Sequence, residues 1–235
     1  MDSLYSKYFK LNSKHLAILI DPEKHNLNEL KSLSKRIDSS GIDLILIGSS
    51  LSMSNYDEAI RVIKLNCNQP VFLFPGNSLQ LSAEADALLN LSLISGRNPE
   101  LLIGEHVRSA MFLKQINLEV IPTGYLLIDG GVKTSVEYMS NTLSIPNNKF
   151  DIAVATAVAG EYLGLRSIYL EAGSGALNSV PTDLIRAVKS QINIPIICGG
   201  GIKTKEEIRA QWDAGTNIVV VGTAFEQNPS LLEQF

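Results

Sequence analysis

Three glycine-containing segments lie in the last third of the chain, and each directly follows a short apolar run. They are residues 169–175 (Tyr-Leu-Glu-Ala-Gly-Ser-Gly), residues 198–202 (Cys-Gly-Gly-Gly-Ile) and residues 221–223 (Val-Gly-Thr). Glycine lets the backbone approach a ligand closely and direct its N–H groups at it. A lone glycine pair would indicate only a tight turn. A triple glycine and a later Gly-Thr after successive runs favour a binding site for a phosphate ester.

Glu171 is the candidate catalytic residue, because it ends an apolar run. Placing a carboxylate at the end of a buried run costs free energy, so such a residue is expected to be paired or to have a function. It can hydrogen-bond the hydroxyls of a polyol phosphate or accept a proton from one of them. A structural ion pair at the edge of the sheet is the alternative. Tyr169 lies on the same face two residues earlier and can add a hydroxyl contact, and Ser174 with its flanking glycines extends the anion site.

A second polar group follows the first two apolar runs. Asp21 ends the first run and precedes a proline, which fixes the exit of the chain, and Ser49 and Ser50 end the second. One carboxylate with hydroxyl groups suits Mg²⁺, which takes oxygen ligands and retains waters and phosphate oxygens. Turn formation at Asp-Pro and helix capping by Ser-Ser explain the same residues. Lys24 can instead, or also, bind phosphate.

Other metal and redox chemistry has little support in the sequence. The three histidines, His15, His25 and His106, do not have the spacing of zinc ligands. The two cysteines, Cys67 and Cys198, are far apart and sit in apolar surroundings. They are expected to be reduced thiols in the core.

The candidate residues follow short apolar runs that alternate with segments of helical period. Each run is apolar throughout rather than alternating, which is typical of parallel strands covered by helices. The fifth run is expected to be interrupted or to end near Pro122. The expected strands are 15–20, 43–47, 70–74, 87–94, one within 118–128, 167–170, 195–198 and 217–221.

One helix is missing from this pattern. Between Phe74 and Ala85 there are too few residues for an ordinary helix, and Pro-Gly-Asn directly after Phe74 is a strong turn signal. The third helix is therefore expected to be absent or reduced to a loop, which would open a groove for a long apolar ligand. The other expected helices are 28–37, 56–65, 99–115, 152–163, 181–191 and 204–214.

Eight strand–helix units predict an α/β protein, a single (β/α)₈ barrel domain over residues 1–235. An open, doubly wound sheet is the alternative, but it rarely needs eight such units. In a (β/α)₈ barrel the active site lies at the C-terminal ends of the strands. Loops seven and eight, with a short extra helix, commonly bind phosphate there. Here the short segment 224–232 is the candidate for that helix.

Composition excludes several classes of protein. A net charge of −4 and a pI near 5.4 argue against a nucleic-acid binder. A hydrophobic content of 45% with 6% aromatics suits an aliphatic α/β core. The first ten residues lack the apolar region of a secretion signal, and no run approaches the ~18 residues of a membrane span. We therefore expect a cytoplasmic protein.

These segments together resemble the geranylgeranylglyceryl phosphate synthase family, including its bacterial heptaprenylglyceryl phosphate synthase relatives. Tyr-Leu-Glu-Ala-Gly-Ser-Gly with the later triple glycine is the most specific part, and its sequence is closer to the geranylgeranyl branch. The matching segments run in family order over nearly the whole chain: 19–24, 47–50, 74–77, 85–87, 93–99, 121–125, 169–175, 199–202 and 222–223.

The resemblance implies a prenyltransferase of ether-lipid and phospholipid biosynthesis. It would join the 3-hydroxyl of sn-glycerol 1-phosphate to a long prenyl diphosphate, most closely geranylgeranyl diphosphate, with release of diphosphate. A heptaprenyl donor is the alternative. The resemblance also implies that the third helix is replaced. It places the acceptor on Tyr169, Leu170, Glu171, Ala172, Gly173, Ser174, Gly175, Gly200, Gly201, Gly222 and Thr223.

The resemblance further implies that Mg²⁺ is bound by Asp21 and Ser50 and bridges to the prenyl diphosphate. The family usually has two glycines before the hydroxyl ligand, whereas this chain has Gly48-Ser49, so Ser49 stays an alternative ligand. Glu171 would orient the attacking hydroxyl and accept its proton. Metal charge and positioning would provide the catalysis.

Two other functions share the phosphate site. A sugar-phosphate isomerase or aldolase would need its own acid–base pair or a Schiff-base lysine at a strand end, and no interior strand lysine is evident. A non-catalytic phosphoester-binding protein would need neither. A homo-oligomer, dimer or hexamer, is also expected. Trp212 is a candidate interface residue, although core packing explains it equally well.

Overall fold

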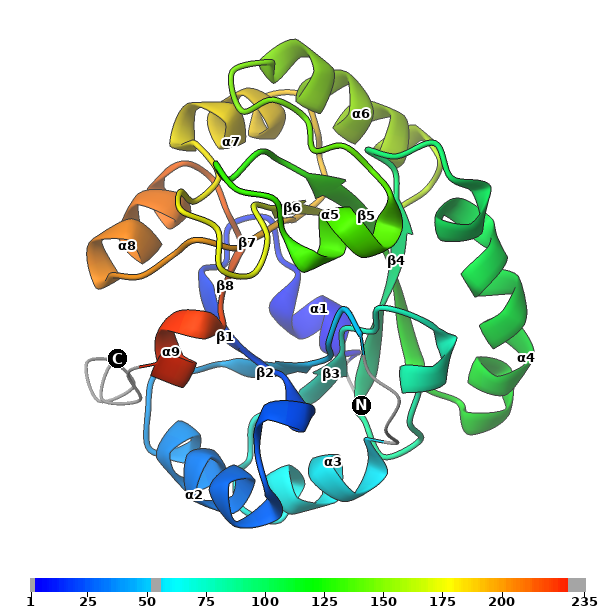
Figure 1. The fold of residues 1–235 in the computed structure, drawn as a ribbon, viewed down its shortest axis with the longest axis vertical. Helices are drawn as coiled ribbons and strands as arrows, with labels where there is room; N and C mark the ends of the chain where they lie inside the picture. Colours follow the sequence, from blue (N-terminus) through cyan, green and yellow to red (C-terminus); the bar gives the residue numbers. More distant parts are fainter. Residues whose placement is uncertain (1–2, 52–55, 228–235) are drawn as a thin grey trace.

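Eight parallel strands form a closed barrel in which neighbours in sequence are neighbours in space (Figure 1). The computed structural model describes residues 3–51 and 56–227. The closed order confirms the (β/α)₈ prediction and excludes the open sheet. The strands are β1 (His15–Ile20), β2 (Leu44–Ile47), β3 (Val71–Leu73), β4 (Ala87–Leu93), β5 (Glu119–Leu127), β6 (Ser167–Glu171), β7 (Ile196–Gly199) and β8 (Ile218–Val221).

The helices surround the barrel as an outer ring (Figure 1). Strands such as β2, β6 and β8 are buried along their whole length, because one face packs inside the barrel and the other against helices. A π-helical segment, Glu100–Gly104, leads into α4. The ring consists of α2 (Leu27–Asp38), α3 (Asp57–Lys64), α4 (Glu105–Ile116), α6 (Phe150–Tyr162), α7 (Thr182–Lys189) and α8 (Lys205–Asp213).

The third helix of the ring is replaced, as predicted. Between β3 and β4 lies only a single 3₁₀ turn, η2 (Ser78–Gln80). The side chain of Gln80 accepts the N–H of Gly76 at 2.9 Å and donates to the Ser49 carbonyl at 2.9 Å. The Glu105 carboxylate of α4 accepts the Ser78 N–H at 2.9 Å. These bonds hold the loop against its neighbours where a helix would otherwise pack.

The predicted interruption of the fifth strand near Pro122 is wrong. β5 runs through this residue, and Pro122 pairs with Asn90 of β4. On its other side Thr123 pairs with Ser167, so Pro122 lies level with Arg166, just before β6 begins. A proline N–H is therefore not required there, and the Pro122 carbonyl still accepts the Arg166 N–H at 2.8 Å.

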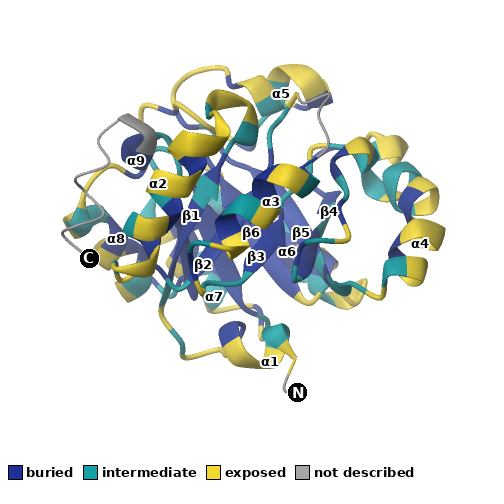
Figure 2. Cartoon of the chain, turned by 90° about the horizontal axis from the view of Figure 1, so that it is seen from below, coloured by how far each residue is buried: buried dark blue, intermediate teal, exposed yellow. Residues whose placement is uncertain are grey.

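Two short helices that the sequence pattern did not indicate lie at opposite ends of the barrel (Figure 2). α1 (Leu4–Tyr8) lies at the N-terminal end of the strands, where Tyr8 and Phe9 pack against Phe72. α5 (Ser135–Ser140) lies in the loop after β5. The expected helix after β8 is α9 (Thr223–Gln227), and the rest of that predicted segment lies outside the described residues.

The remaining expectations for the core are met. Cys67 and Cys198 are free and buried, as predicted. Burial raises the pKa of the Cys67 thiol to about 11. Within residues 3–51 and 56–227, no helix has the length and apolar character needed to cross a membrane.

Candidate active site

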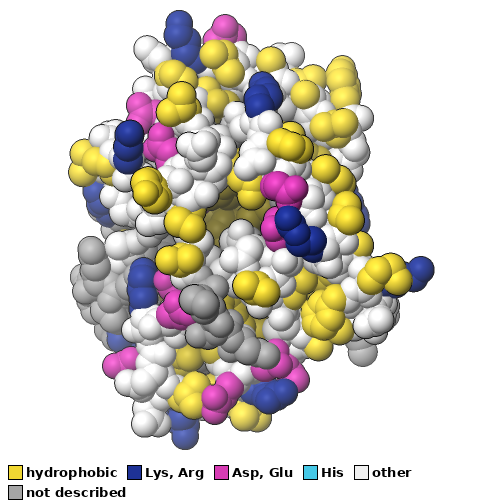
Figure 3. Space-filling model, turned by 45° about the vertical axis from the view of Figure 1, so that its right-hand side comes forward, with side chains coloured by type: hydrophobic (Ala, Val, Ile, Leu, Met, Phe, Trp, Pro, Cys, Tyr) yellow, Lys and Arg dark blue, Asp and Glu magenta, His cyan; other side chains and the backbone are white. Residues whose placement is uncertain are grey.

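A cavity of about 930 Å³ opens at the C-terminal ends of the strands (Figure 3). It brings together both groups of polar residues that the sequence singled out, although they are up to about 200 residues apart. The predicted residues that line it are Asp21, Ser49, Ser50, Tyr169, Glu171, Ser174, Gly175, Gly200, Gly201, Gly222 and Thr223.

Glu171 lies on one side of the cavity as the last residue of β6, and its side chain is only 5% exposed. The Gly173 N–H donates to its Oε1 at 2.6 Å. Among the described residues Glu171 forms no ion pair, so the alternative of a structural ion pair finds no support there.

Burial raises the pKa of the Glu171 carboxyl to about 7, and the hydrogen bond from Gly173 and the nearby Tyr169 hydroxyl partly oppose that rise. A carboxyl with a pKa near neutrality can both accept and return a proton under working conditions. The Tyr169 hydroxyl is buried and makes no well-aligned hydrogen bond to a described residue, although it is close enough to Glu171 to influence its pKa. Its hydrogen-bonding capacity is therefore available to a ligand.

The glycines beside Glu171 have backbone conformations that a side chain would disturb. Gly173, Gly175, Gly200 and Gly201 have φ angles of 97°, 76°, 84° and 70°, all in the left-handed region. A Cβ on Gly200 would lie 2.5 Å from Glu171 Oε1. The loops after β6 and β7 can therefore bring backbone N–H groups close to a ligand only because these positions are glycine.

On the Glu171 side of the cavity, the loops after two strands meet, and some of the predicted residues do not line the cavity. Ser174 Oγ lies 3.3 Å from Thr223 Oγ1, so the loops after β6 and β8 meet. Leu170 and Ala172 are buried among the apolar side chains outside the barrel and do not line the cavity, because successive strand residues point to opposite faces. Gly173 also lies outside the lining and acts through its N–H bond to Glu171.

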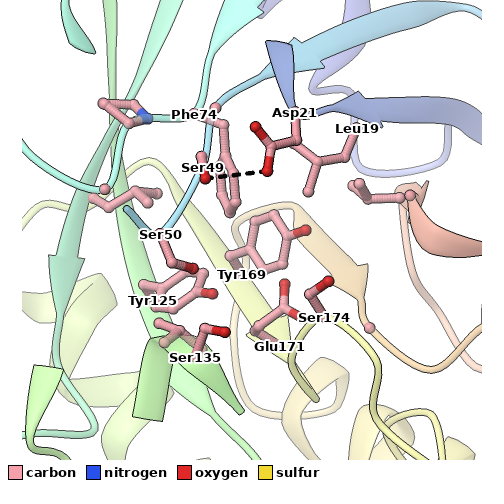
Figure 4. A pocket seen from close by; sticks show the side chains of 18 of the residues that line it. Leu19, Asp21, Ser49, Ser50, Phe74, Tyr125, Ser135, Tyr169, Glu171 and Ser174 are labelled. Carbon is pink, nitrogen blue, oxygen red and sulfur yellow. Dashed lines mark hydrogen bonds between the residues drawn. The ribbon is translucent and has the colours of Figure 1, made fainter. Parts of the chain in front are cut away.

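The opposite side of the cavity carries Asp21 and the two serines (Figure 4). Ser49 Oγ donates to Asp21 Oδ2 at 3.1 Å, and Lys24 Nζ lies 3.9 Å from the same oxygen. Asp21 Oδ1 accepts the Glu23 N–H at 3.2 Å. Ser50 also lines the cavity, and Figure 4 shows it nearer to Tyr125. The structure thus joins Asp21 to Ser49 by a hydrogen bond.

Sequence reasoning did not assign a role to the aromatic residues between the two sides. Phe74 follows β3 and Tyr125 lies in β5, and both line the cavity beside Tyr169. The sequence could have indicated both residues, because each lies near the C-terminal end of a strand, where barrel enzymes place functional side chains. Burial, and secondarily the charge of Glu171, raise the pKa of the Tyr125 hydroxyl well above its usual value.

The cavity continues toward the flank where the third helix is missing. Its lining there comes from the loop after β3, from β4 and from the inner face of α4. The Nε2–H of His106 donates to the Leu91 carbonyl at 2.9 Å. The apolar residues of this part are Leu81, Leu88, Leu91, Leu93 and Leu101. This arrangement matches the groove that the sequence predicted.

Comparison with known proteins gives consistent matches over nearly the whole chain. The PcrB family model matches residues 9–235. The geranylgeranylglyceryl phosphate synthase of Chitinophaga pinensis is 49% identical, covering 94% of this chain and 88% of that protein. The enzyme of the same name from Spirosoma linguale is 45% identical, covering 96% and 92%.

A solved structure also matches over nearly the whole chain. The crystal structure of (S)-3-O-geranylgeranylglyceryl phosphate synthase from Thermoplasma acidophilum, in complex with its substrate sn-glycerol 1-phosphate, superimposes with a TM-score of 0.92. That protein is 33% identical, and the match covers 99% of this chain and 95% of that one. The chain therefore belongs to the PcrB family, the family of the geranylgeranylglyceryl phosphate synthases.

Proposed function

We propose that the protein forms the ether bond between the 3-hydroxyl of sn-glycerol 1-phosphate and geranylgeranyl diphosphate, with release of diphosphate, in ether-lipid biosynthesis. The observation that carries this proposal is the two-sided cavity. A buried carboxyl with glycine loops faces an Asp–Ser group, and an apolar groove leads away. The names of the relatives in Chitinophaga and Thermoplasma support both substrates.

The acceptor would lie on the side of Glu171. Backbone N–H groups after β6, β7 and β8 would hold its phosphate, since glycine loops at the last strands of such a barrel are suited to anions. The Tyr169 hydroxyl, which lies beside Glu171, can also bond an acceptor oxygen. Glu171 would orient the 3-hydroxyl and accept its proton, a role that its pKa of about 7 supports.

The donor diphosphate would lie on the side of Asp21. The carboxylate of Asp21 and a hydroxyl of Ser49 or Ser50 form an all-oxygen donor set that fits Mg²⁺. Among the described residues no cluster of three or more His, Cys, Asp or Glu side chains accompanies them. Such a site suits an ion that takes its other ligands from water and substrate phosphates. Bound there, Mg²⁺ would stabilise the negative charge of the departing diphosphate.

Whether Ser49 or Ser50 is the Mg²⁺ ligand can be tested directly. The hydrogen bond between Ser49 and Asp21 favours Ser49 as the hydroxyl that accompanies the carboxylate, whereas the resemblance favours Ser50. Alanine variants at each position, compared by the Mg²⁺ concentration that gives half-maximal activity, would identify the ligand. The serine whose loss raises that concentration is the ligand.

A homo-oligomer, dimer or hexamer, is also part of this proposal. Exposed apolar side chains on the outer face of α4, including Val107 and Met111, offer a surface for it. Trp212 does not support it, because its indole N–H donates to the His15 carbonyl at 3.1 Å and its ring packs against the core.

The function is tested by incubating the protein with Mg²⁺, sn-glycerol 1-phosphate and a series of prenyl diphosphates of increasing length. We expect a prenylglyceryl phosphate, identified by its mass, with the highest kcat/KM for the geranylgeranyl donor. Preference for a heptaprenyl donor would show that the proposed length of the prenyl donor is wrong, while the reaction type stands. Absence of product with every donor would refute the function.

A further inference from the structure

One buried glutamine links the segment that replaces the third helix to the loop after β2. Gln80 lies in η2, is fully buried and does not line the cavity. Its Oε1 accepts the Gly76 N–H at 2.9 Å, and its Nε2 donates to the Ser49 carbonyl at 2.9 Å. A backbone N–H can only donate and a carbonyl can only accept, so these two partners fix the orientation of the amide.

The Ser49 carbonyl lies just past the paired part of the sheet. The Phe74 N–H donates to the Ile47 carbonyl at 2.8 Å, directly after the last residue pair of β2 and β3. Ser49 lies two residues beyond Ile47 and is not part of the strand pairing. The amide of Gln80 therefore holds the backbone at a point where the sheet no longer does.

The loops after β2 and β3 are also in close backbone contact. A Cβ on Gly76 would lie 2.6 Å from the Ser49 carbonyl oxygen, so the chain can approach this carbonyl only because position 76 is glycine. The loop after β3 is anchored on its other side by the Glu105 carboxylate, which accepts the Ser78 N–H at 2.9 Å. Gln80 thus reaches Ser49 from a segment that is itself held in place.

We propose that Gln80 is a positioning residue for the donor side of the cavity. It holds the backbone at Ser49 and thereby sets where the hydroxyls of Ser49 and Ser50 meet Mg²⁺ and the diphosphate. The inference rests on the proposed function and adds to it a residue that lies outside the cavity lining. The segment that replaces the third helix then has two roles, because it opens the groove and also supports the donor site.

Ser49 connects the amide of Gln80 to the site. Its carbonyl accepts from Gln80, while its Oγ donates to Asp21 Oδ2 at 3.1 Å (Figure 4). A shift of the backbone at Ser49 would therefore move its hydroxyl relative to the Asp21 carboxylate. Loss of a group that orients metal ligands without touching the metal typically lowers metal affinity about 10–100-fold. The proposed acceptor site lies across the cavity at Glu171, so binding of the acceptor should not change.

Binding of inorganic diphosphate tests the proposal without turnover. Diphosphate is titrated by calorimetry, in the presence of Mg²⁺, into protein saturated with sn-glycerol 1-phosphate, so that the acceptor phosphate site is already occupied. Gln80→Met keeps an unbranched side chain of similar length but removes both hydrogen bonds. We expect this variant to raise the Kd of diphosphate about 10-fold. The Kd of sn-glycerol 1-phosphate, measured in a separate titration, should not change.

A second glutamine provides a matched control. Gln69 precedes β3, at the opposite end of the strand, and its Nε2 donates to the carbonyls of Ile37 and Ile42 at 3.3 Å each. Gln69→Met should leave both dissociation constants at their wild-type values. Should Gln80→Met fail to fold, Gln80→Glu gives the same comparison. Glutamate keeps an acceptor for the Gly76 N–H but lacks the amide N–H that donates to Ser49, so diphosphate binding should again weaken.

The outcomes separate this inference from the proposed function. Wild-type affinity for diphosphate in the Gln80 variant would overturn the positioning role. Equal weakening of both ligands would also overturn it, because it would show a general loss of structure. In either case the proposed function stands if the wild-type protein forms prenylglyceryl phosphate. If the wild-type protein binds no diphosphate in the presence of Mg²⁺, the proposed donor site is wrong and the inference fails with it.

Discussion

At the scale of single residues, the environment of Glu171 decides its chemistry. An exposed glutamate is ionised at neutral pH and is a weak base, whereas burial holds the pKa of this carboxyl at about 7. The hydrogen bond from Gly173 fixes the position of one oxygen, and the glycine at position 200 leaves room for it. The sequence predicted that this residue lies at the site and assigned it a catalytic role, which stays a prediction. It could not predict the pKa, because burial depends on how the barrel closes.

The pH dependence of transfer follows from this pKa. Only the ionised carboxyl can accept the proton of the hydroxyl, so kcat/KM should rise with pH up to about 7 and then level off. Glu171→Gln should slow transfer about 100-fold or more and abolish this dependence. A pH–rate profile of the two proteins tests the prediction. Near-normal turnover of the glutamine variant would remove Glu171 from the mechanism.

The same residue should destabilise the fold at neutral pH. The ordinary pKa of the carboxyl is 4.5, so between pH 4.5 and about 7 the folded protein binds more protons than the unfolded chain. The free energy of unfolding therefore falls as pH rises through this window, by about 3 kcal/mol for a shift of this order. Urea unfolding at pH 5 and pH 8 should show this fall in the wild-type protein.

Glu171→Gln provides the comparison for stability. Because glutamine does not ionise, the variant should lose this part of the pH dependence and be more stable than the wild-type protein at pH 8. Glu58→Gln, at an exposed position on α3, should leave the pH dependence unchanged. A glutamine variant at position 171 that is less stable than wild type at pH 8 would contradict the account.

At the scale of elements, contacts between residues distant in sequence hold in place a short helix that the apolar pattern of the sequence did not indicate. α1 has only five residues, too few for a recognisable helical period. It is held by the Glu119 carboxylate, which accepts the N–H groups of Leu4 at 2.8 Å and Tyr5 at 3.0 Å. Arg166 lies over the Tyr5 ring at 3.6 Å. These partners lie more than 100 residues away, so local sequence could not indicate the helix.

The Glu119 contact yields a prediction for this element. Glu119→Gln keeps the volume of the side chain but removes its charge and one of its two acceptor oxygens. We expect the free energy of unfolding to fall by about 1.5–3 kcal/mol, the usual contribution of hydrogen bonds to a charged group. Urea unfolding at fixed pH measures it. The exposed Glu58→Gln variant serves as the control, and equal stabilities of the two variants would show that Glu119 does not anchor α1.

At the scale of the whole molecule, the barrel was predictable because its strands are apolar on both faces and alternate with helical segments. The missing third helix was predictable from the shortness of the segment between Phe74 and Ala85 and from its Pro-Gly-Asn turn. The serine beside Asp21 and the gathering of Phe74, Tyr125 and Tyr169 were not. Both depend on the register between strands and on the closure of the sheet, which bring together side chains from distant segments. Pro122 was misjudged for the same reason, since its effect depends on where β6 begins.

The two halves of the cavity are interpreted as the sites of two substrates that are joined between carbon and oxygen. Incubation with Mg²⁺, geranylgeranyl diphosphate and sn-glycerol 1-phosphate labelled with ¹⁸O at its 3-hydroxyl tests this claim most directly. The account predicts one geranylgeranylglyceryl phosphate that retains the label, and an unlabelled diphosphate. Absence of this ether, or recovery of the label in the released diphosphate, would contradict it.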